Sequence, residues 1–316
     1  MYYPCAAMKK KLDEPFSRAR AAVLQGRSTD CFEVLADLLA ERGDPRGEFA
    51  RVQLELERGE KPALREREKS LLEAHGDAWL GDLTDCFNRY SWRGGFWRHV
   101  DLRDVDDAIL ADTLRHPSAA VLEMLRVSHP TDADLAAEFA RHEDIPLRVL
   151  GLGALDEGQN MFSYVEEGVG ELNGLEDALP HLEELHVIGA SFTPRSMKRL
   201  RVLDVRTGVT PPTVEALSAC RFPALKRLVL GFELHVEPEP SEELDPLVYL
   251  ANQLLPLMQG DATPALEHLV LATFFDEGGG EQKREALRQL RGTPLGARLT
   301  RLEFTTPKDE WEMLAP

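Results

Sequence analysis

Residues 181–205 read HLEELHVIGASFTPRSMKRLRVLDV, and this stretch holds two copies of one phrase. The phrase is Leu-x-x-Leu-x-Val, first at residues 182–187 and again at residues 200–205. In a short strand the side chains alternate between two faces, so the fourth and sixth positions point into a core and the third and fifth point to solvent. Because one such strand cannot bury its apolar face alone, the pattern indicates that neighbouring copies stack.

Further copies of the phrase lie on both sides of this stretch. The eight copies begin at Trp97, Leu122, Leu147, Leu182, Leu200, Leu225, Leu266 and Leu299. Their starts are separated by 25, 25, 35, 18, 25, 41 and 33 residues. Parallel strands need a crossover connection, and amphipathic segments such as residues 106–117 and 281–292 lie between copies. The sequence therefore predicts an α/β fold of parallel strands joined by helices.

This pattern resembles the leucine-rich-repeat family, whose units run to about 20–29 residues. The likeness implies a solenoid with parallel strands on its concave face and helices on its convex face. None of the eight copies has the asparagine or cysteine that the family carries at the ninth position, so we expect irregular repeats. We predict an irregular leucine-rich-repeat solenoid of about eight repeats at residues 96–306, with acidic inserts near residues 153–181 and 233–262 and a C-terminal tail at residues 307–316.

The region before the repeats has a helical pattern. Residues 30–58 carry apolar residues at helical spacing, and Gly43 ends one helix before Asp44 caps the next. A third helix is predicted from Pro62 to His75. We therefore predict an N-terminal arm at residues 1–27 and an all-α cap domain at residues 28–95.

The phrase LADLLAERGDPRGEFARVQLEL at residues 35–56 is similar to the bacterial repeat-companion domain, a small helical module found in front of leucine-rich repeats. HGDAWLG at residues 75–81 and WRGGF at residues 92–96 also resemble that family. The family usually has Tyr and Trp where this chain has Leu35 and Leu38, which preserves the hydrophobic character. The resemblance implies a bacterial protein and an architecture in which the helical domain caps the open end of the solenoid. The residues of the first phrase that carry it are Ala36, Asp37, Glu41, Arg42, Gly43, Asp44, Pro45, Arg46, Glu48, Phe49, Arg51 and Gln53.

The net charge of −18 argues against nucleic-acid binding and against an anionic membrane surface, because both require clustered positive charge. The chain has no apolar run long enough for a membrane span and no signal-peptide pattern at its start. Its four cysteines form no zinc pattern and are typical of free thiols in a reducing compartment. We therefore expect a cytoplasmic protein.

The negative charge is concentrated in two stretches without Lys or Arg. Residues 149–194 hold nine acidic residues, and residues 228–282 hold eleven. Two interpretations stay open: solvated loops, or contact sites for a protein partner with a basic surface. The densest acidic run is Glu237, Glu239, Glu242, Glu243 and Asp245.

No motif in the sequence predicts catalysis. There is no H-E-x-x-H, no G-x-S-x-G, no P-loop and no calcium-loop spacing, and the glycine run that begins at Gly278 fits a flexible turn. We predict no catalytic residue, no metal site and no cofactor, and hence a protein that is not an enzyme.

The concave face of the predicted solenoid is the candidate binding site for a protein partner. Adjacent strands lie about 4.8 Å apart, so Asp101 could pair with Arg126, and His186 with Asp204. The function predicted is a non-enzymatic interaction scaffold. The alternatives are a leucine-rich-repeat regulator of a small GTPase or other signalling enzyme, and a self-associating structural protein; the oligomeric state is left open. The candidate partner-binding residues are Asp101, Arg126, His186, Asp204, Arg227, His268 and Arg301.

Overall fold

The computed structural model describes residues 14–26, 29–130, 135–142, 145–153, 174–188, 193–206, 209–232, 246–273 and 280–305. Within these ranges the protein has the predicted α/β class, because it combines helices with nine strands of one sheet whose order follows the chain. The described residues divide into two compact units. The first unit takes its residues from 1–101, 111–124 and 144–146, and the second from 102–110, 125–143 and 147–316.

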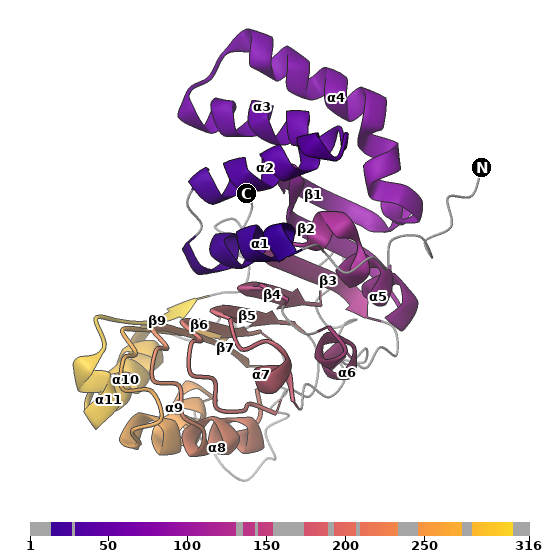
Figure 1. The fold of residues 1–316 in the computed structure, drawn as a ribbon. Coiled ribbons are helices and arrows are strands. Elements are labelled where there is room, and N and C mark those ends of the chain that lie inside the picture. Colours follow the sequence, from indigo (N-terminus) through magenta and orange to yellow (C-terminus); the bar gives the residue numbers. More distant parts are fainter. Residues whose placement is uncertain are drawn as a thin grey trace. The chain divides into compact units, whose positions relative to one another are not determined.

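The first unit is mainly helical. Helices α1, α2, α3 and α4 follow one another and pack in sequence, each against the next (Figure 1). Helix α5 (Asp107–Arg115) and strand β2 have residues in both units. The elements of this part of the chain are α1 (Glu14–Gly26), α2 (Thr29–Glu41), α3 (Arg46–Arg58), α4 (Pro62–Leu80), the 3-10 helix η2 (Gly81–Cys86), β1 (Phe87–Arg93), β2 (Phe96–Val105) and the 3-10 helix η3 (Pro117–Ala119).

In the second unit, described helices lie in most of the connections between consecutive strands. In every copy of the repeated phrase from Leu122 onward, the last four residues lie in a strand. Its elements are β3 (Met124–Pro130), α6 (Leu135–Ala140), β4 (Val149–Leu152), α7 (Leu175–Ala178), β5 (Glu184–Val187), β6 (Val202–Val205), α8 (Pro211–Ala219), β7 (Arg227–Phe232), α9 (Pro246–Gln259), β8 (His268–Thr273), α10 (Gly280–Arg291), α11 (Pro294–Arg298) and β9 (Arg301–Thr305).

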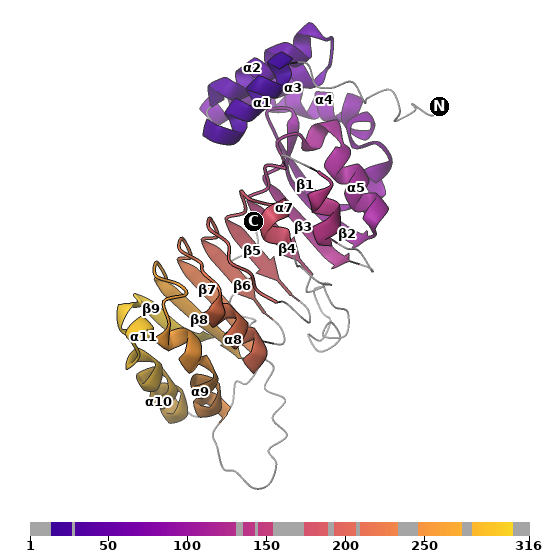
Figure 2. The same ribbon diagram turned by 60° about the horizontal axis from the view of Figure 1, so that its bottom comes forward.

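Strands β4 to β9 are parallel and lie side by side in chain order (Figure 2). In this register, residues at the same position of two neighbouring phrases are partners on adjacent strands. At the fourth position, for example, Leu150 pairs with Leu185, and Leu185 pairs with Leu203. The equal phrases therefore stack without any shift along the strands.

The fourth and sixth phrase positions form the core of the second unit, as predicted. Leu185 and Leu203 are fully buried, and Leu302 on the last strand is 8% exposed. Helices α8, α9, α10 and α11 pack against one another and lie together on one side of these strands (Figures 1 and 2). The alternation of the phrase therefore gives each strand one face that is covered by apolar packing.

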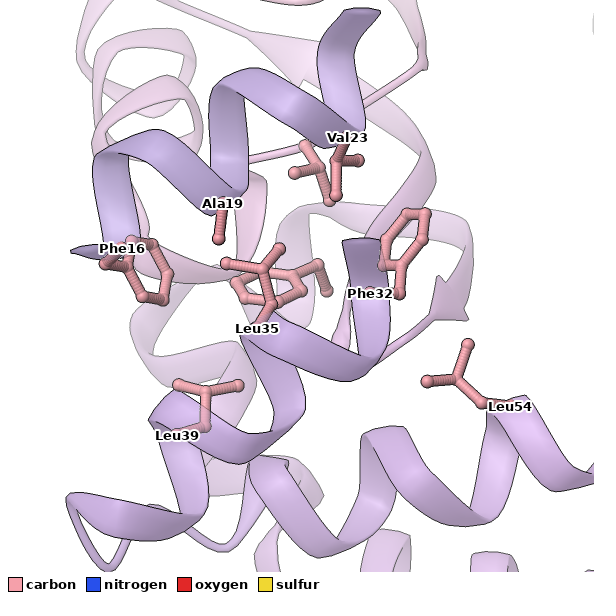
Figure 3. Close-up of a cluster of buried hydrophobic side chains, with 9 residues drawn as sticks. Phe16, Ala19, Val23, Phe32, Leu35, Leu39 and Leu54 are labelled. Carbon is pink, nitrogen blue, oxygen red and sulfur yellow. The ribbon is translucent and has the colours of Figure 1, made fainter. Parts of the chain in front are cut away.

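Helix α1 lies in the range predicted to be an arm. Phe16, Ala19 and Val23 follow helical spacing on α1 and are buried against α2, where Phe32 and Leu35 face them (Figure 3). Because a single short helix gains its stability from such packing, the sequence pattern of α1 alone was too weak a signal. The complete cluster also contains Leu39, Leu54, Phe96 and Val121.

The turn between β1 and β2 packs against helices α2 and α3. Gly94 and Gly95 have positive φ angles of 56° and 79°, which favour glycine. A Cβ atom on Gly94 would lie 2.4 Å from the Phe32 ring, and one on Gly95 would lie 2.8 Å from the Arg46 carbonyl oxygen. The Gly95 N–H donates to Oε1 of Gln53 at 3.1 Å. The segments at residues 35–56 and 92–96 therefore belong to one packed core.

Helix α4 runs past its predicted end at His75 and reaches Leu80. The Trp79 ring lies 5.1 Å from the Phe49 ring and 5.7 Å from the Trp92 ring. Burial of an aromatic side chain stabilises the last turn of the helix and accounts for the extension.

Among the residues that the structure describes, no helix combines the length and the apolar character needed to cross a membrane. The acidic run Glu237, Glu239, Glu242, Glu243 and Asp245 lies outside the described residues, as does the tail at residues 307–316. Much of the first predicted insert, residues 154–173, lies outside them too. Helix α9, with Leu250 and Leu254 buried, falls within the range predicted for the second insert.

Candidate functional site

The third and fifth phrase positions form two rows of side chains across strands β4 to β9, which we call the two-row face. Neighbours within a row belong to adjacent strands and are about 4.8 Å apart. The third-position row is Val149, Glu184, Val202, Arg227, His268 and Arg301, and the fifth-position row is Gly151, His186, Asp204, Val229, Val270 and Glu303.

The fifth-position row is less accessible than predicted. Gly151, Asp204, Val229 and Val270 are buried, so the expectation that both outward positions point to solvent is wrong for this row. A short side chain in an interior strand has a neighbour on either side, and these neighbours limit the access of water. The third-position residues are half-buried or exposed and can be reached by a partner.

His186 and Asp204 meet across β5 and β6, which confirms the predicted pair. Nδ1 of His186 lies 3.4 Å from Oδ2 of Asp204, and Nε2 lies 3.7 Å from a carboxylate oxygen of Glu184. Nε of Arg206 donates to both Asp204 oxygens at 2.9 and 3.1 Å, and Nη2 donates to Oδ2 at 2.9 Å. The Asp204 side chain is 2% exposed and that of Arg206 is 3% exposed. Asp204 is therefore a buried counter-ion that orients His186 and is itself out of reach of a partner.

The charges of this cluster shift its pKa values in opposite directions. Burial, the largest effect on His186, disfavours the imidazolium, but the hydrogen bonds and negative charges of Asp204 and Glu184 together outweigh it and raise the pKa. At Asp204 burial, again the largest effect, acts in the other direction and would raise the pKa, but the hydrogen bonds to His186 and Arg206 and their positive charges together outweigh it and lower the pKa. Both shifts favour a charged His186–Asp204–Arg206 cluster.

Arg206 occupies its position because strand β7 has a glycine beside it. A Cβ atom on Gly231 would lie 2.4 Å from the Arg206 carbonyl oxygen and 2.6 Å from its Cα atom. Only glycine permits such a close approach of two backbones. Sequence reasoning missed Arg206, which follows the end of β6 directly and lies two residues after Asp204, a spacing that places alternate residues of an extended chain on one face.

The remaining candidates belong to separate regions. Arg227, His268 and Arg301 are opposite one another on β7, β8 and β9, and Nε of Arg301 forms an ion pair with Glu303 at 2.8 Å. Arg126 lies on β3 in the second unit. Asp101 belongs to the first unit, so its pairing with Arg126 would join the two units and stays a prediction.

Within the described ranges, no group of three His, Cys, Asp or Glu side chains is arranged to hold a metal ion. Cys31, Cys86 and Cys220 are half-buried, and none of these three described cysteines is in a disulfide. Sγ of Cys220, the residue that follows α8, donates to the carbonyl oxygen of Pro194 at 3.3 Å.

No protein-family model matches this chain, and no curated protein sequence matches it. A solved structure of a protein from Bacteroides fragilis is similar to it over 60% of this chain and 53% of that chain, with 19% sequence identity and a TM-score of 0.45. The chain thus spans about half the length of that protein. The fold class therefore rests on the strands and helices of the chain itself.

We expect the stability of the second unit to depend on pH through His186. Its pKa is raised on folding, so its contribution is fully present below the unfolded pKa of about 6.5 and is lost as the pH rises through the folded value. His186→Gln should flatten this part of the pH profile of the free energy of unfolding. Urea unfolding from pH 6 to pH 9 measures it, with His268→Gln as a control that removes a histidine from the same face. An unchanged pH profile in His186→Gln would contradict the charged cluster.

Proposed function

We propose that this chain is a non-enzymatic scaffold that binds a protein partner through the two-row face. We further propose that the strands and helices belong to an irregular leucine-rich-repeat solenoid with a helical cap. The supporting observation is the register of β4 to β9, which aligns the third and fifth phrase positions of the six strands into two continuous rows, of which the third-position row is accessible. Such a strip suits an extended partner surface better than a small molecule.

The chemistry of the strip supports a protein partner. Half-buried Arg227 and His268 stand in the same row as Val149 and Val202, so this row offers both basic and apolar side chains to a partner. A few arginine and large side chains usually dominate the affinity of protein interfaces, while charge complementarity selects the partner. We assign the selecting role to four basic residues of this face and to Arg126 on the adjacent strand β3. The four residues are His186, Arg227, His268 and Arg301.

The two acidic stretches would add a second contact. Their charge would attract a basic surface of the partner and speed association. Screening by salt weakens such attraction, so the contribution of these stretches depends on ionic strength.

Affinity capture from the native cell, read by mass spectrometry, tests the proposal. The variant Arg126→Ala/His186→Ala/Arg227→Ala should lose most of the captured partner, because it removes two basic side chains from the two-row face and one from the adjacent strand β3. A matched control, Arg221→Ala/Arg284→Ala/Arg298→Ala, removes three exposed cations that lie off the two rows. Circular dichroism confirms that both variants are folded.

Two outcomes would contradict the proposal. Equal capture by the face variant and the control variant would exclude the two-row face as the binding site. Capture that is identical at low and high salt would exclude the contact of the acidic stretches with a basic partner.

A further inference from the structure

Strand β1 (Phe87–Arg93) is the first strand of the sheet, so among the described residues β2 is the strand that pairs with it and its other edge is open. Four consecutive residues of β1, at positions 88–91, are exposed. Because the side chains of a strand alternate between two faces, both faces of β1 are open to solvent over this length. An open edge of this kind presents backbone donors and acceptors that can pair with another strand.

The turn of Gly94 and Gly95 determines which backbone groups of β1 point to the open edge. Both glycines have positive φ angles, as at the two central positions of a type I′ turn. In such a hairpin the flanking residues Arg93 and Phe96 form a hydrogen-bonded pair, and the two kinds of pair alternate along the strands. Odd-numbered residues of β1 therefore direct their backbone groups to β2, whereas even-numbered residues such as Tyr90 direct theirs to the open edge.

Tyr90 also gives this edge an apolar side chain. The residue is 43% exposed, and the other exposed large apolar residues in the described part of the chain are Val34 on α2 and Tyr249 on α9. The centre of the Tyr90 ring lies 5.8 Å from that of Phe87 and 6.4 Å from that of Trp92. These neighbours hold the exposed ring beside the open backbone groups.

We propose that two copies of this chain pair through their open β1 edges, antiparallel and with Tyr90 on the twofold axis. Tyr90 is the midpoint of the strand, so this register pairs all 7 residues of one copy with those of the other. A register centred on Arg89 would place its two copies opposite each other, and one centred on Ser91 would place Arg89 opposite Arg93. Like charges directly opposite each other destabilise a sheet. With Tyr90 on the axis, Arg89 lies opposite Ser91 of the second copy and no arginine opposes another.

The pairing has a clear physical character. The two copies of Tyr90 exchange backbone hydrogen bonds in both directions, and their rings lie beside each other on one face. A single pair of short strands buries less surface than a standard protein interface, so we expect a weak dimer in exchange with the monomer. The proposed pairing is independent of the proposed function, because β1 contributes no residue to the two-row face.

Sedimentation equilibrium of the full-length protein over a wide concentration series measures the dimer. Tyr90→Lys removes the aromatic pair and places two ammonium groups beside each other at the axis, so it should weaken the dimer about tenfold or more. Tyr249→Lys is the matched control, because it replaces a tyrosine of nearly equal exposure, 41%, on helix α9. Circular dichroism confirms that both variants are folded.

A cysteine cross-link tests the register. With Tyr90 on the axis, the two Cα atoms at position 90 lie about 5.5 Å apart, which a disulfide can span. The two copies of position 89 are then diagonal neighbours at about 7–8 Å, which is too far. Mild oxidation should therefore cross-link Tyr90→Cys but not Arg89→Cys, with the natural chain showing the background from its own 4 cysteines.

Three results would overturn the inference. The first is a natural chain that stays monomeric at every concentration, which would leave the open edge to an extended segment of another protein. The second is a dimer that survives Tyr90→Lys or that Tyr249→Lys weakens equally. The third is cross-linking at position 89 in preference to position 90. Partner capture by Tyr90→Lys should equal that of the natural chain, so failure of the dimer and failure of the proposed function are distinguishable.

Discussion

Asp204→Asn should lower the free energy of unfolding by about 3–5 kcal/mol, the cost of breaking a buried ion pair by removing one partner. The Asp204 and Arg206 side chains are almost fully buried and share three donor–acceptor contacts of 2.9–3.1 Å. Asparagine has nearly the same shape but no charge, so the substitution removes the buried negative charge that pairs with both Arg206 and His186. Urea unfolding followed by far-ultraviolet circular dichroism measures the loss.

Two comparisons separate this effect from a general effect of losing a carboxylate. Asp37→Asn removes the partner of Arg51 in an ion pair of similar length, 2.7 Å, but both side chains are more than half exposed. That change should cost less than about 1 kcal/mol. The double variant Asp204→Asn/Arg206→Met should recover much of the loss, because it also removes the buried cation. A cost of Asp204→Asn no greater than that of Asp37→Asn would contradict the burial of this pair.

Much of the second unit could be predicted because its signal is local and repeated. The copies that begin at Leu182, Leu200 and Leu225 each place apolar residues at positions four and six, and each of them is a strand with these residues buried. The equal spacing within the phrase also predicts the register, since a shift by one residue would turn the apolar positions to the other face. The pairing of His186 with Asp204 followed from that register.

The first unit was harder to predict because its elements depend on distant partners. Strand β1 (Phe87–Arg93) lies in a range predicted to be helical, and most of its residues are exposed, so no alternating apolar pattern marks it. Its Trp92 side chain packs on Phe49 of α3, with ring centres 5.7 Å apart. Helix α1 likewise depends on α2. Such tertiary contacts override local propensity and leave no trace in a short window of sequence.

The candidate site was predictable in its outline but not in its accessibility. The phrase identifies which residues share a face, and this placed Arg227, His268 and Arg301 opposite one another. It does not reveal how neighbouring side chains shield the fifth position, so the burial of Asp204 was missed. The phrase also does not reveal that Gly231 and Gly151 are closely approached by other residues, Gly231 by the Arg206 backbone and Gly151 by the Arg126 side chain.

The second large effect is expected at the crossing of helices α2 and α3. Gly47 on α3 faces α2 so closely that a Cβ atom would lie 2.5 Å from the Ala40 nitrogen and 2.7 Å from the Ala36 carbonyl oxygen. Both are backbone atoms, so the helices themselves must move apart. Gly47→Ala should therefore destabilise the first unit by about 1–3 kcal/mol, even though alanine favours a helix by roughly 1 kcal/mol.

A glycine in a neighbouring helix provides the matched control for this prediction. Gly76 lies within α4 and has nothing within 4 Å of the position of a Cβ atom, so Gly76→Ala should stabilise the protein by about 0.5–1 kcal/mol. Three of the four tryptophans, Trp79, Trp92 and Trp97, belong to the first unit, so tryptophan fluorescence during urea unfolding reports mainly on that unit. Opposite signs for the two changes would show that close backbone contact, and not helix propensity, sets the requirement for glycine at position 47. If Gly47→Ala were as stabilising as Gly76→Ala, α2 and α3 could not cross at this distance.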